Sequence, residues 1–383
     1  MSACTLKAAC LAVVIATGSA SSAAPARLAD TGVDFCSDGQ SQVIACGSTG
    51  QDAESGLDVT RPGDANGRLG LRYTRLCNSG EPAGQGHCPA APAAGNARDE
   101  WGCTRDEVTG LVWETKTSDG GRRDGTRGYT YYTPGYDPEG QYGGPHDATG
   151  YVHAVNALGL CGQHDWRLPT PAELLTIVDM GITTLPTVDP RFLPNTAANL
   201  YWADGTVFRN PFADELAWGA DFAFGSGAIS AQFRSDQRPV RLVHGAPVAQ
   251  RFRALPDDPQ EVRDALGLVW RRCVEGMTFD GTTCTGTPLA LGWTDALAHV
   301  QQEAAAAGIA WRLPNAKELG SLLDHTRPGH IDPRAFPGQP ADAQWTSSPI
   351  PTYLLPRCVF FPDGVTSICN ATTMLAMRLV RDR

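Results

Sequence analysis

The sequence predicts an α+β protein made of two tandem units, each with two helices, a small antiparallel sheet and disulfide staples. Three observations lead to this prediction. A series of motifs occurs twice in the same order, and each copy contains two segments with helix signals. Ten cysteines, most of them in closely spaced pairs, follow an N-terminal leader.

The composition is that of a folded protein with an acidic surface. Of the 383 residues, 42% are hydrophobic and 19% are charged, which is not typical of a disordered chain. The formal net charge is −10. This balance argues against general nucleic-acid binding, because such binding needs a basic surface.

Residues 1–24 have the pattern of a secretory signal peptide. Lys7 precedes the apolar run 8–16, and small residues follow through Ala24. The run is too short to cross a membrane, and no later stretch has the roughly 18 apolar residues that a membrane span needs. We therefore expect an exported protein without a transmembrane segment, located in the periplasm, on the cell surface or outside the cell.

The cysteines agree with export. Four close pairs and two further residues remain after removal of the leader, and we predict that all ten form disulfides, although the sequence does not fix their connectivity. Pairing of neighbours is the simplest arrangement. No Cys-x-x-Cys motif is present, so we predict no metal centre. The disulfide candidates are Cys36, Cys46, Cys77, Cys88, Cys103, Cys161, Cys273, Cys284, Cys358 and Cys369.

The internal repeat defines the domain organisation. Five motifs recur with similar spacing: Gly110–Trp113 as Gly267–Trp270, Trp166–Thr170 as Trp311–Asn315, Val188–Phe192 as Ile331–Phe336, Trp202 as Trp345, and Val240–Val243 as Met377–Val380. The repeat divides the chain into a leader (1–24), a Cys-containing N-terminal segment (25–98), a first unit (99–245), a linker (246–259) and a second unit (260–383).

Each unit begins with a short apolar strand and continues with a helix. We expect this helix at 151–158 in the first unit and at 295–307 in the second, each ended by a glycine. A second helix follows the Trp-Arg-Leu-Pro segment. Short strands separated by glycine turns complete the unit and close a small antiparallel sheet.

The second helix of each unit has a capping box. Thr170 with Glu173, and Asn315 with Glu318, have the spacing in which the first side chain caps the helix and the glutamate reaches back. We interpret the repeated Trp, Arg and Glu residues as core and framework rather than as ligand contacts. This structural set comprises Trp113, Trp166, Arg167, Glu173, Trp202, Arg241, Trp270, Trp311, Arg312, Glu318, Trp345 and Arg378.

In this order, the repeated motifs resemble one bacterial family, the C-terminal domain of the collagen-like adhesin Lcl, long known only as a domain of unknown function. The resemblance covers both units. It implies a C-type-lectin-like fold for each of them, and the Arg-Leu-Pro-Thr-x-x-Glu segment is also similar to the formylglycine-generating-enzyme branch of that fold group. The resemblance further suggests an adhesin-like role, because the domain of the Lcl adhesin is associated with binding of sulfated glycosaminoglycans.

An insertion at 119–150 in the first unit has no counterpart in the second. Long irregular insertions on a repeated scaffold often carry function, and rigid aromatic side chains suit stacking on sugars or protein surfaces. The alternative is a loop that packs its tyrosines against its own unit. The ligand-binding candidates are Arg122, Arg123, Arg127, Tyr129, Tyr131, Tyr132, Tyr136 and Tyr142.

Calcium is an open alternative in this insertion. The wider lectin-like group uses loop carboxylates, but no calcium-loop spacing is present. The carboxylates concerned are Asp119, Asp124, Asp137 and Asp147. We predict no other cofactor.

No catalytic motif stands out, and we predict no catalytic residue. Nucleophile elbows, zinc-binding helices and phosphate loops are missing from the sequence, and its eight histidines are scattered and expected at the surface. The leading hypothesis is a secreted, non-catalytic protein that binds glycans or a cell-surface partner. The second is a structural component of a surface or envelope assembly. The third is an enzyme related to the formylglycine-generating branch.

Overall fold

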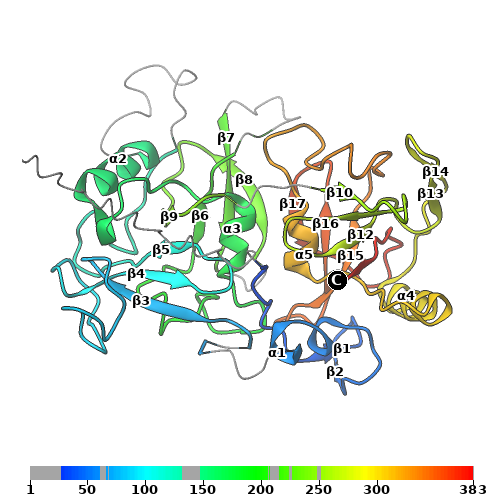
Figure 1. Cartoon of the computed structure of the whole chain (residues 1–383), viewed down its shortest axis with the longest axis horizontal. Coiled ribbons are helices and arrows are strands. Elements are labelled where there is room, and N and C mark those ends of the chain that lie inside the picture. The colour runs from blue at the N-terminus through cyan, green and yellow to red at the C-terminus, as the bar shows by residue number, and fades with distance from the viewer. Residues whose placement is uncertain are drawn as a thin grey trace, which may run out of the picture.

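The computed structural model describes residues 27–60, 66–67, 69–131, 147–205, 207, 215–223, 227–247 and 252–382. Within these ranges the chain forms two units that lie side by side (Figure 1). The predicted signal peptide falls outside the described residues, and so do Tyr132, Tyr136, Asp137 and Tyr142. Of the described helices, none has the length and apolar character needed to cross a membrane.

The first unit contains two antiparallel sheets and two helices. The larger sheet has the order β3-β4-β5-β9 and the smaller one the order β6-β7-β8. The elements are β3 (Tyr73–Cys77), β4 (Trp101–Asp106), β5 (Val112–Glu114), α2 (Ala148–Leu158), the 3-10 turn η2 (Leu160–Gly162), α3 (Pro171–Thr176), β6 (Leu200–Trp202), β7 (Leu216–Asp221), β8 (Ile229–Phe233) and β9 (Val243–His244).

The second unit repeats this plan. A four-stranded sheet has the order β10-β11-β12-β18, a three-stranded sheet has the order β15-β16-β17, and a hairpin, β13-β14, is added. The elements are β10 (Arg253–Ala254), β11 (Glu261–Arg263), β12 (Val269–Arg271), β13 (Met277–Phe279), β14 (Cys284–Gly286), α4 (Trp293–Ala307), α5 (Ala316–Ser321), β15 (Gln344–Pro349), β16 (Pro356–Phe360), β17 (Val365–Ile368) and β18 (Val380–Arg381). The predicted mixture of helices and small antiparallel sheets is confirmed.

The N-terminal segment is shared between the two units. Its first part forms β1 (Cys36–Ser37), β2 (Val43–Ile44), η1 (Asp52–Glu54) and α1 (Leu57–Thr60). This part lies against the second unit, where Ser37 donates a hydrogen bond to the carbonyl of Leu354 at 2.5 Å (Figure 1). The later strand β3 pairs instead with β4 of the first unit. The segment therefore contacts both repeats.

Both predicted capping boxes are present. The Thr170 side chain accepts from the Glu173 amide at 3.2 Å, and the Glu173 carboxylate accepts from the Thr170 amide at 2.8 Å. Asn315 and Glu318 repeat this exchange at 2.9 and 2.8 Å. The longer helices begin earlier than we expected: α2 starts at Ala148, because the side chain of the preceding aspartate caps it, and α4 starts at Trp293.

The predicted framework residues lie where the repeat suggested. All six repeated tryptophans are buried, and so are the two repeated arginines of the closing strands. The Arg241 guanidinium donates to the Glu114 carbonyl at 2.6 Å, and that of Arg378 donates to the Arg271 carbonyl at 2.8 Å. These buried arginines thus donate hydrogen bonds to main-chain carbonyls of strands β5 and β12.

Five disulfides form, and they use all ten predicted cysteines. Four join close neighbours: Cys36–Cys46, Cys77–Cys88, Cys273–Cys284 and Cys358–Cys369. The fifth, Cys103–Cys161, links strand β4 to the turn after α2 across 58 residues. Two of these disulfides lie within the N-terminal segment, and the other three each lie within one unit.

One hydrophobic core runs through both units. Leu174 and Leu175 of α3 belong to the same buried cluster as Leu319 of α5 and Leu322 directly after it. The equivalent helices of the two repeats thus pack together, and strands β8 and β17 also meet. Apolar burial on this scale is the main source of stability, so we treat the two repeats as one folded body.

Candidate ligand site between the two units

The structure corrects the role predicted for two tyrosines of the insertion. Tyr129 and Tyr131 are only 1% and 4% exposed, and both belong to the core of the first unit. The Tyr129 ring lies 4.7 Å from that of Tyr151, and the Tyr131 ring lies 5.4 Å from that of Trp202. The prediction that they contact a ligand is wrong, because apolar contacts bury both rings.

Arg123 is also structural. It is buried and donates to the carbonyls of Gly102 and Thr115 at 2.9 and 2.7 Å. Among the predicted arginines, Arg122 is exposed and Arg127 is half-buried, with its guanidinium 5.6 Å from the Tyr129 ring centre.

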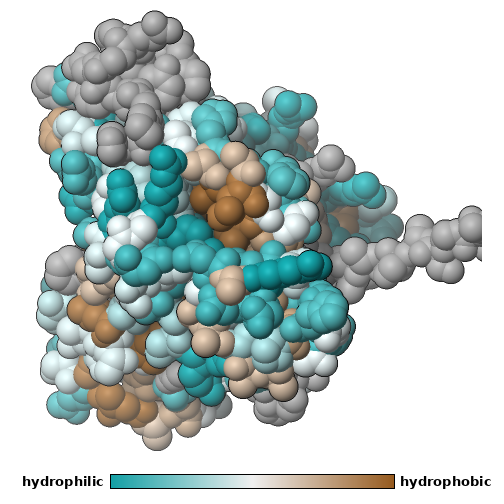
Figure 2. Space-filling model, turned by 90° about the vertical axis from the view of Figure 1, so that its left-hand side faces the viewer, coloured by the Kyte–Doolittle hydropathy of each residue, from teal (hydrophilic) through white to brown (hydrophobic). Residues whose placement is uncertain are grey.

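A shallow depression of about 170 Å³ lies beside Arg122. Its lining includes Asn96 and Asp119 together with Val155 and Leu158 of α2. Figure 2 views this end of the molecule, where hydrophobic residues form separate patches among hydrophilic ones. This depression is what the described structure retains of the predicted ligand site.

The described carboxylates of the insertion support the backbone. Asp119 accepts from Thr117 and Asn96, Asp124 accepts from Thr126, and Asp147 caps α2. The described residues contain no group of three His, Cys, Asp or Glu side chains placed to hold a metal ion. The open calcium alternative therefore gains no support from these residues.

A buried ionic cluster in the first unit was not anticipated from the sequence. Lys116 donates to the Glu114 carboxylate at 3.1 Å and to the Val240 carbonyl at 2.9 Å, and the Tyr151 hydroxyl donates to the same carboxylate. Burial lowers the pKa of Lys116 to about 8 and raises that of Tyr151 well above its usual value. All three side chains are almost fully buried, so the cluster ties helix α2 to the sheet.

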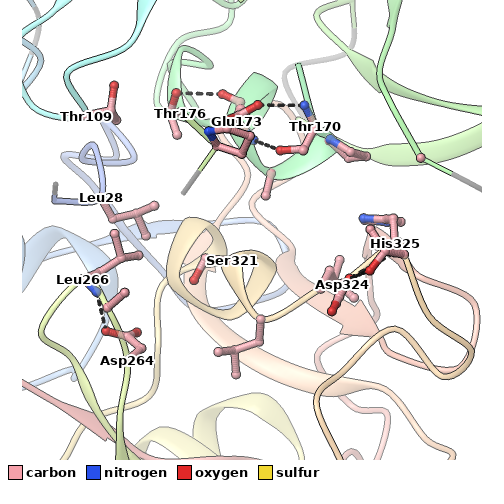
Figure 3. Close-up of a pocket in the computed structure, with 18 of the residues that line it drawn as sticks. Leu28, Thr109, Thr170, Glu173, Thr176, Asp264, Leu266, Ser321, Asp324 and His325 are labelled. Carbon is pink, nitrogen blue, oxygen red and sulfur yellow. Dashed lines mark hydrogen bonds between the residues drawn. The ribbon is translucent and has the colours of Figure 1, made fainter. Parts of the chain in front are cut away.

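A cavity of about 310 Å³ lies where the two units meet. Its walls include Leu28 of the N-terminal segment, the start of α3 with Thr170 and Pro171, the turn Asp264–Leu266 before β12, and the loop Asp324–Thr326 after α5. Figure 3 shows α3 and α5 facing each other across it, with the Asp264 turn and the Asp324 loop on opposite sides. Both repeats are needed to form this site, which we call the inter-unit cleft.

Two carboxylates of the inter-unit cleft are already paired with arginine. Glu173 binds both terminal nitrogens of Arg167 at 2.7 Å, and Asp324 lies 2.5 Å from the Arg327 guanidinium. The first ion pair fixes the start of α3, and the second lies within the loop that follows α5. They leave little of either arginine available to attract an anion.

Asp264 and Asp204 have no such partner in the described part of the chain. Asp264 accepts from the Trp270 indole at 2.8 Å and from the Leu266 and Leu268 amides at 2.9 Å. Burial raises its pKa to about 6. Asp204 is exposed on the same cavity wall as Gly205. Neither carboxylate forms an ion pair with a described lysine or arginine, so the cleft contains two carboxylates without an ion-pair partner among the described residues.

Two of the three histidines of the second unit correct another expectation. His325 and His330 are buried rather than at the surface, and their rings lie 4.5 and 5.6 Å from that of Trp218 in the first unit. One ring nitrogen of His325 lies 2.8 Å from the Gly364 carbonyl, and burial lowers its pKa to about 4. His325 is therefore neutral near pH 7, where it lines the cleft and packs the units together.

Comparison with known proteins identifies the family to which the two repeated units belong. No curated protein gives a significant match to the chain. The family model of the Lcl C-terminal domain matches residues 102–244 and 260–381, which are the two units that share the cleft. The chain therefore belongs to the Lcl C-terminal domain family and carries two tandem copies of that domain.

Proposed function

We propose that this chain is an exported, non-catalytic binding protein that recognises a glycan in the inter-unit cleft. The observation that carries the proposal is the cavity of about 310 Å³ whose walls come from both repeats. Ligand sites are concave, largely apolar and equipped with a few fixed polar groups. The cleft fits this description, with Leu266 and Phe252 beside Thr109, Thr170 and the carboxylates.

Family membership and the disulfides support this function. We propose that each repeat is a C-type-lectin-like unit, as the resemblance implies, and that the pair acts as an adhesin-like module. The five disulfides favour an oxidising compartment such as the periplasm or the cell exterior.

The described residues favour a binding function over a catalytic one. All ten described cysteines are paired, which leaves no thiol for chemistry of the formylglycine-generating kind. Two cleft carboxylates are held by arginines, and His325 is neutral and held by a carbonyl. These groups are suited to fixing a ligand rather than to exchanging protons with it.

The test uses a glycan array and a variant that fills the cleft. Ala265 lines the cavity and is exposed, so Ala265→Trp adds a bulky ring to the cleft with little change to the core. Ala306→Trp, on the exposed face of α4, is the matched control. We expect the full oxidised chain to bind a defined glycan class, Ala306→Trp to retain binding, and Ala265→Trp to lose it.

The array is run with calcium and with EDTA, which decides the calcium alternative. A blank array with folded protein would overturn glycan recognition. Equal binding by the Ala265→Trp and Ala306→Trp variants would place the glycan outside the cleft, and the depression beside Arg122 would then be the next site to test.

A further inference from the structure

We infer that the inter-unit cleft selects glycans that carry a free ammonium group, such as oligomers of an amino sugar, and rejects sulfated and other anionic glycans. This inference deepens the proposed function and rests on it. It is drawn from the distribution of paired and unpaired charges around the cavity.

Asp264 is the first anchor for an ammonium group. Three N–H donors hold its carboxylate in one orientation: the Leu266 and Leu268 amides on one oxygen and the Trp270 indole on the other. A carboxylate has about four acceptor positions, so at least one remains for a ligand. The fixed geometry means that little side-chain entropy is lost when a ligand binds.

The surroundings of Asp264 make a cation favourable there. Its elevated pKa reflects a carboxylate that has lost water without gaining a positive neighbour. An ammonium group that enters the cleft supplies the missing charge. A charge-assisted hydrogen bond is about twice as strong as a neutral one.

Asp204 provides a second negative group on the wall formed by the first unit. Its backbone amide donates to the Pro169 carbonyl at 2.7 Å, which fixes the residue next to the start of α3. Its side chain is exposed and forms no ion pair within the described ranges. Asp204 and Asp264 come from different repeats, so a ligand that contacts both is recognised only by the assembled pair.

An anionic ligand finds one arginine, Arg27, among the described residues that line the cleft, against the two carboxylates without an ion-pair partner. Arg167 is occupied by Glu173 and by the Gly245 carbonyl, and Arg327 is occupied by Asp324. Neither Arg167 nor Arg327 is among the described lining residues, whereas Arg27, which is exposed, does line the cavity. The net charge of −10 adds long-range repulsion of sulfated chains.

The test compares three probes by calorimetry at pH 7: a glucosamine oligomer, its fully N-acetylated form and a heparin fragment of similar length. We expect the oxidised full chain to bind the glucosamine oligomer at least tenfold more tightly than the N-acetylated form and to show no binding of heparin. The preference should shrink as salt is added, because screening weakens exposed charge interactions.

Two variants assign the preference to the proposed carboxylates. Asp264→Asn keeps an acceptor for the Leu266 and Leu268 amides, and Asp204→Asn removes the charge of an exposed side chain with little change of shape. We expect each variant to reduce the preference for the free amine at least fivefold. Ala265→Trp should abolish binding of both sugar oligomers.

The outcomes separate this inference from the proposed function. Equal affinity for the two sugar oligomers, with loss in Ala265→Trp, would leave the cleft as a glycan site and overturn the charge selection. Tighter binding of heparin, or an unchanged preference in both Asp→Asn variants, would overturn it as well. Failure of every probe together with a blank array would overturn both proposals.

Discussion

The Lys317 ammonium of the second unit donates a hydrogen bond to the Thr176 carbonyl of the first unit at 3.0 Å. The same ammonium donates to the Asp30 carbonyl of the N-terminal segment at 2.5 Å. Lys317 is 2% exposed, and burial lowers its pKa to about 8 although Asp30 and neighbouring aspartates act in the opposite direction. One buried cation therefore ties together both repeats and the segment that precedes them.

Lys317→Met is expected to destabilise the whole chain by about 3–5 kcal/mol, the range for removing one partner of a buried charged group. The substitution leaves two buried carbonyls without their donor and removes the positive charge beside the aspartates. Urea unfolding followed by tryptophan fluorescence measures the loss. Arg334→Met at an exposed position is the control and should change stability by less than about 0.5 kcal/mol. A Lys317→Met protein as stable as the control would show that the cation does not hold the units together.

Asp52 is expected to make stability fall as pH rises. Burial raises its pKa from 3.8 to about 7, and it accepts from the hydroxyls of Thr31 and Ser348. Because the folded state keeps this proton at pH values where the unfolded state releases it, the contribution is fully present below about pH 4. It is lost as pH rises toward 7.

The measurement compares melting temperatures of the wild type and Asp52→Asn between pH 4.5 and 8. Asparagine keeps an acceptor for both hydroxyls but does not ionise. We expect the variant to gain stability relative to the wild type as pH rises, with the difference levelling above about pH 7. The difference between the two proteins cancels other titrating groups, such as Asp264. A constant difference across this range would mean that Asp52 does not titrate in this window.

Much of each repeat could be predicted from the sequence, because the residues that indicate its short helices and most of its disulfides lie close together in the chain. Thr170 and Glu173 lie three residues apart, and that spacing alone specifies the start of α3. The same is true of Asn315 and Glu318 at α5. Close cysteine pairs also suggest their partners by proximity, whereas Cys103 and Cys161 lie 58 residues apart and no local signal indicates their pairing.

The site could not be predicted in the same way because it depends on contacts between distant segments. Tyr131 is typical of a ligand-binding loop in the sequence, but its ring is buried against Trp202. The cleft forms only when α3 and α5 pack together, and neither helix carries a signal for that contact beyond its apolar face. Asp264 belongs to no sequence motif, so the sequence did not identify it as a site residue. Its importance comes from its place in the folded cleft, where no described lysine or arginine pairs with its carboxylate.

Tyr131→Ala is expected to destabilise the first unit by about 3–5 kcal/mol, as for other buried aromatic side chains. The ring is 4% exposed and packs edge-on against Trp202, so its removal leaves a cavity in the core. Tyr353→Ala, at a residue that is 58% exposed, is the matched control and should have an effect below about 0.5 kcal/mol. Thermal unfolding of both variants checks this. If the Tyr131→Ala and Tyr353→Ala variants were equally stable, the Tyr131 ring would not be part of the core, and Tyr131 would again be a candidate ligand contact.

The Cys103–Cys161 disulfide is expected to contribute more stability than Cys36–Cys46. The first bridges 58 residues and the second bridges 10, and a longer closed loop restricts the unfolded chain more strongly. Loop-closure entropy gives about 4 kcal/mol for the long loop and about 3 kcal/mol for the short one. Paired Cys→Ala variants of each bridge, unfolded in urea without reductant, measure the two losses. A larger loss for the short bridge would show that contacts in the folded state outweigh loop entropy, and that the Cys36–Cys46 disulfide contributes more stability than Cys103–Cys161.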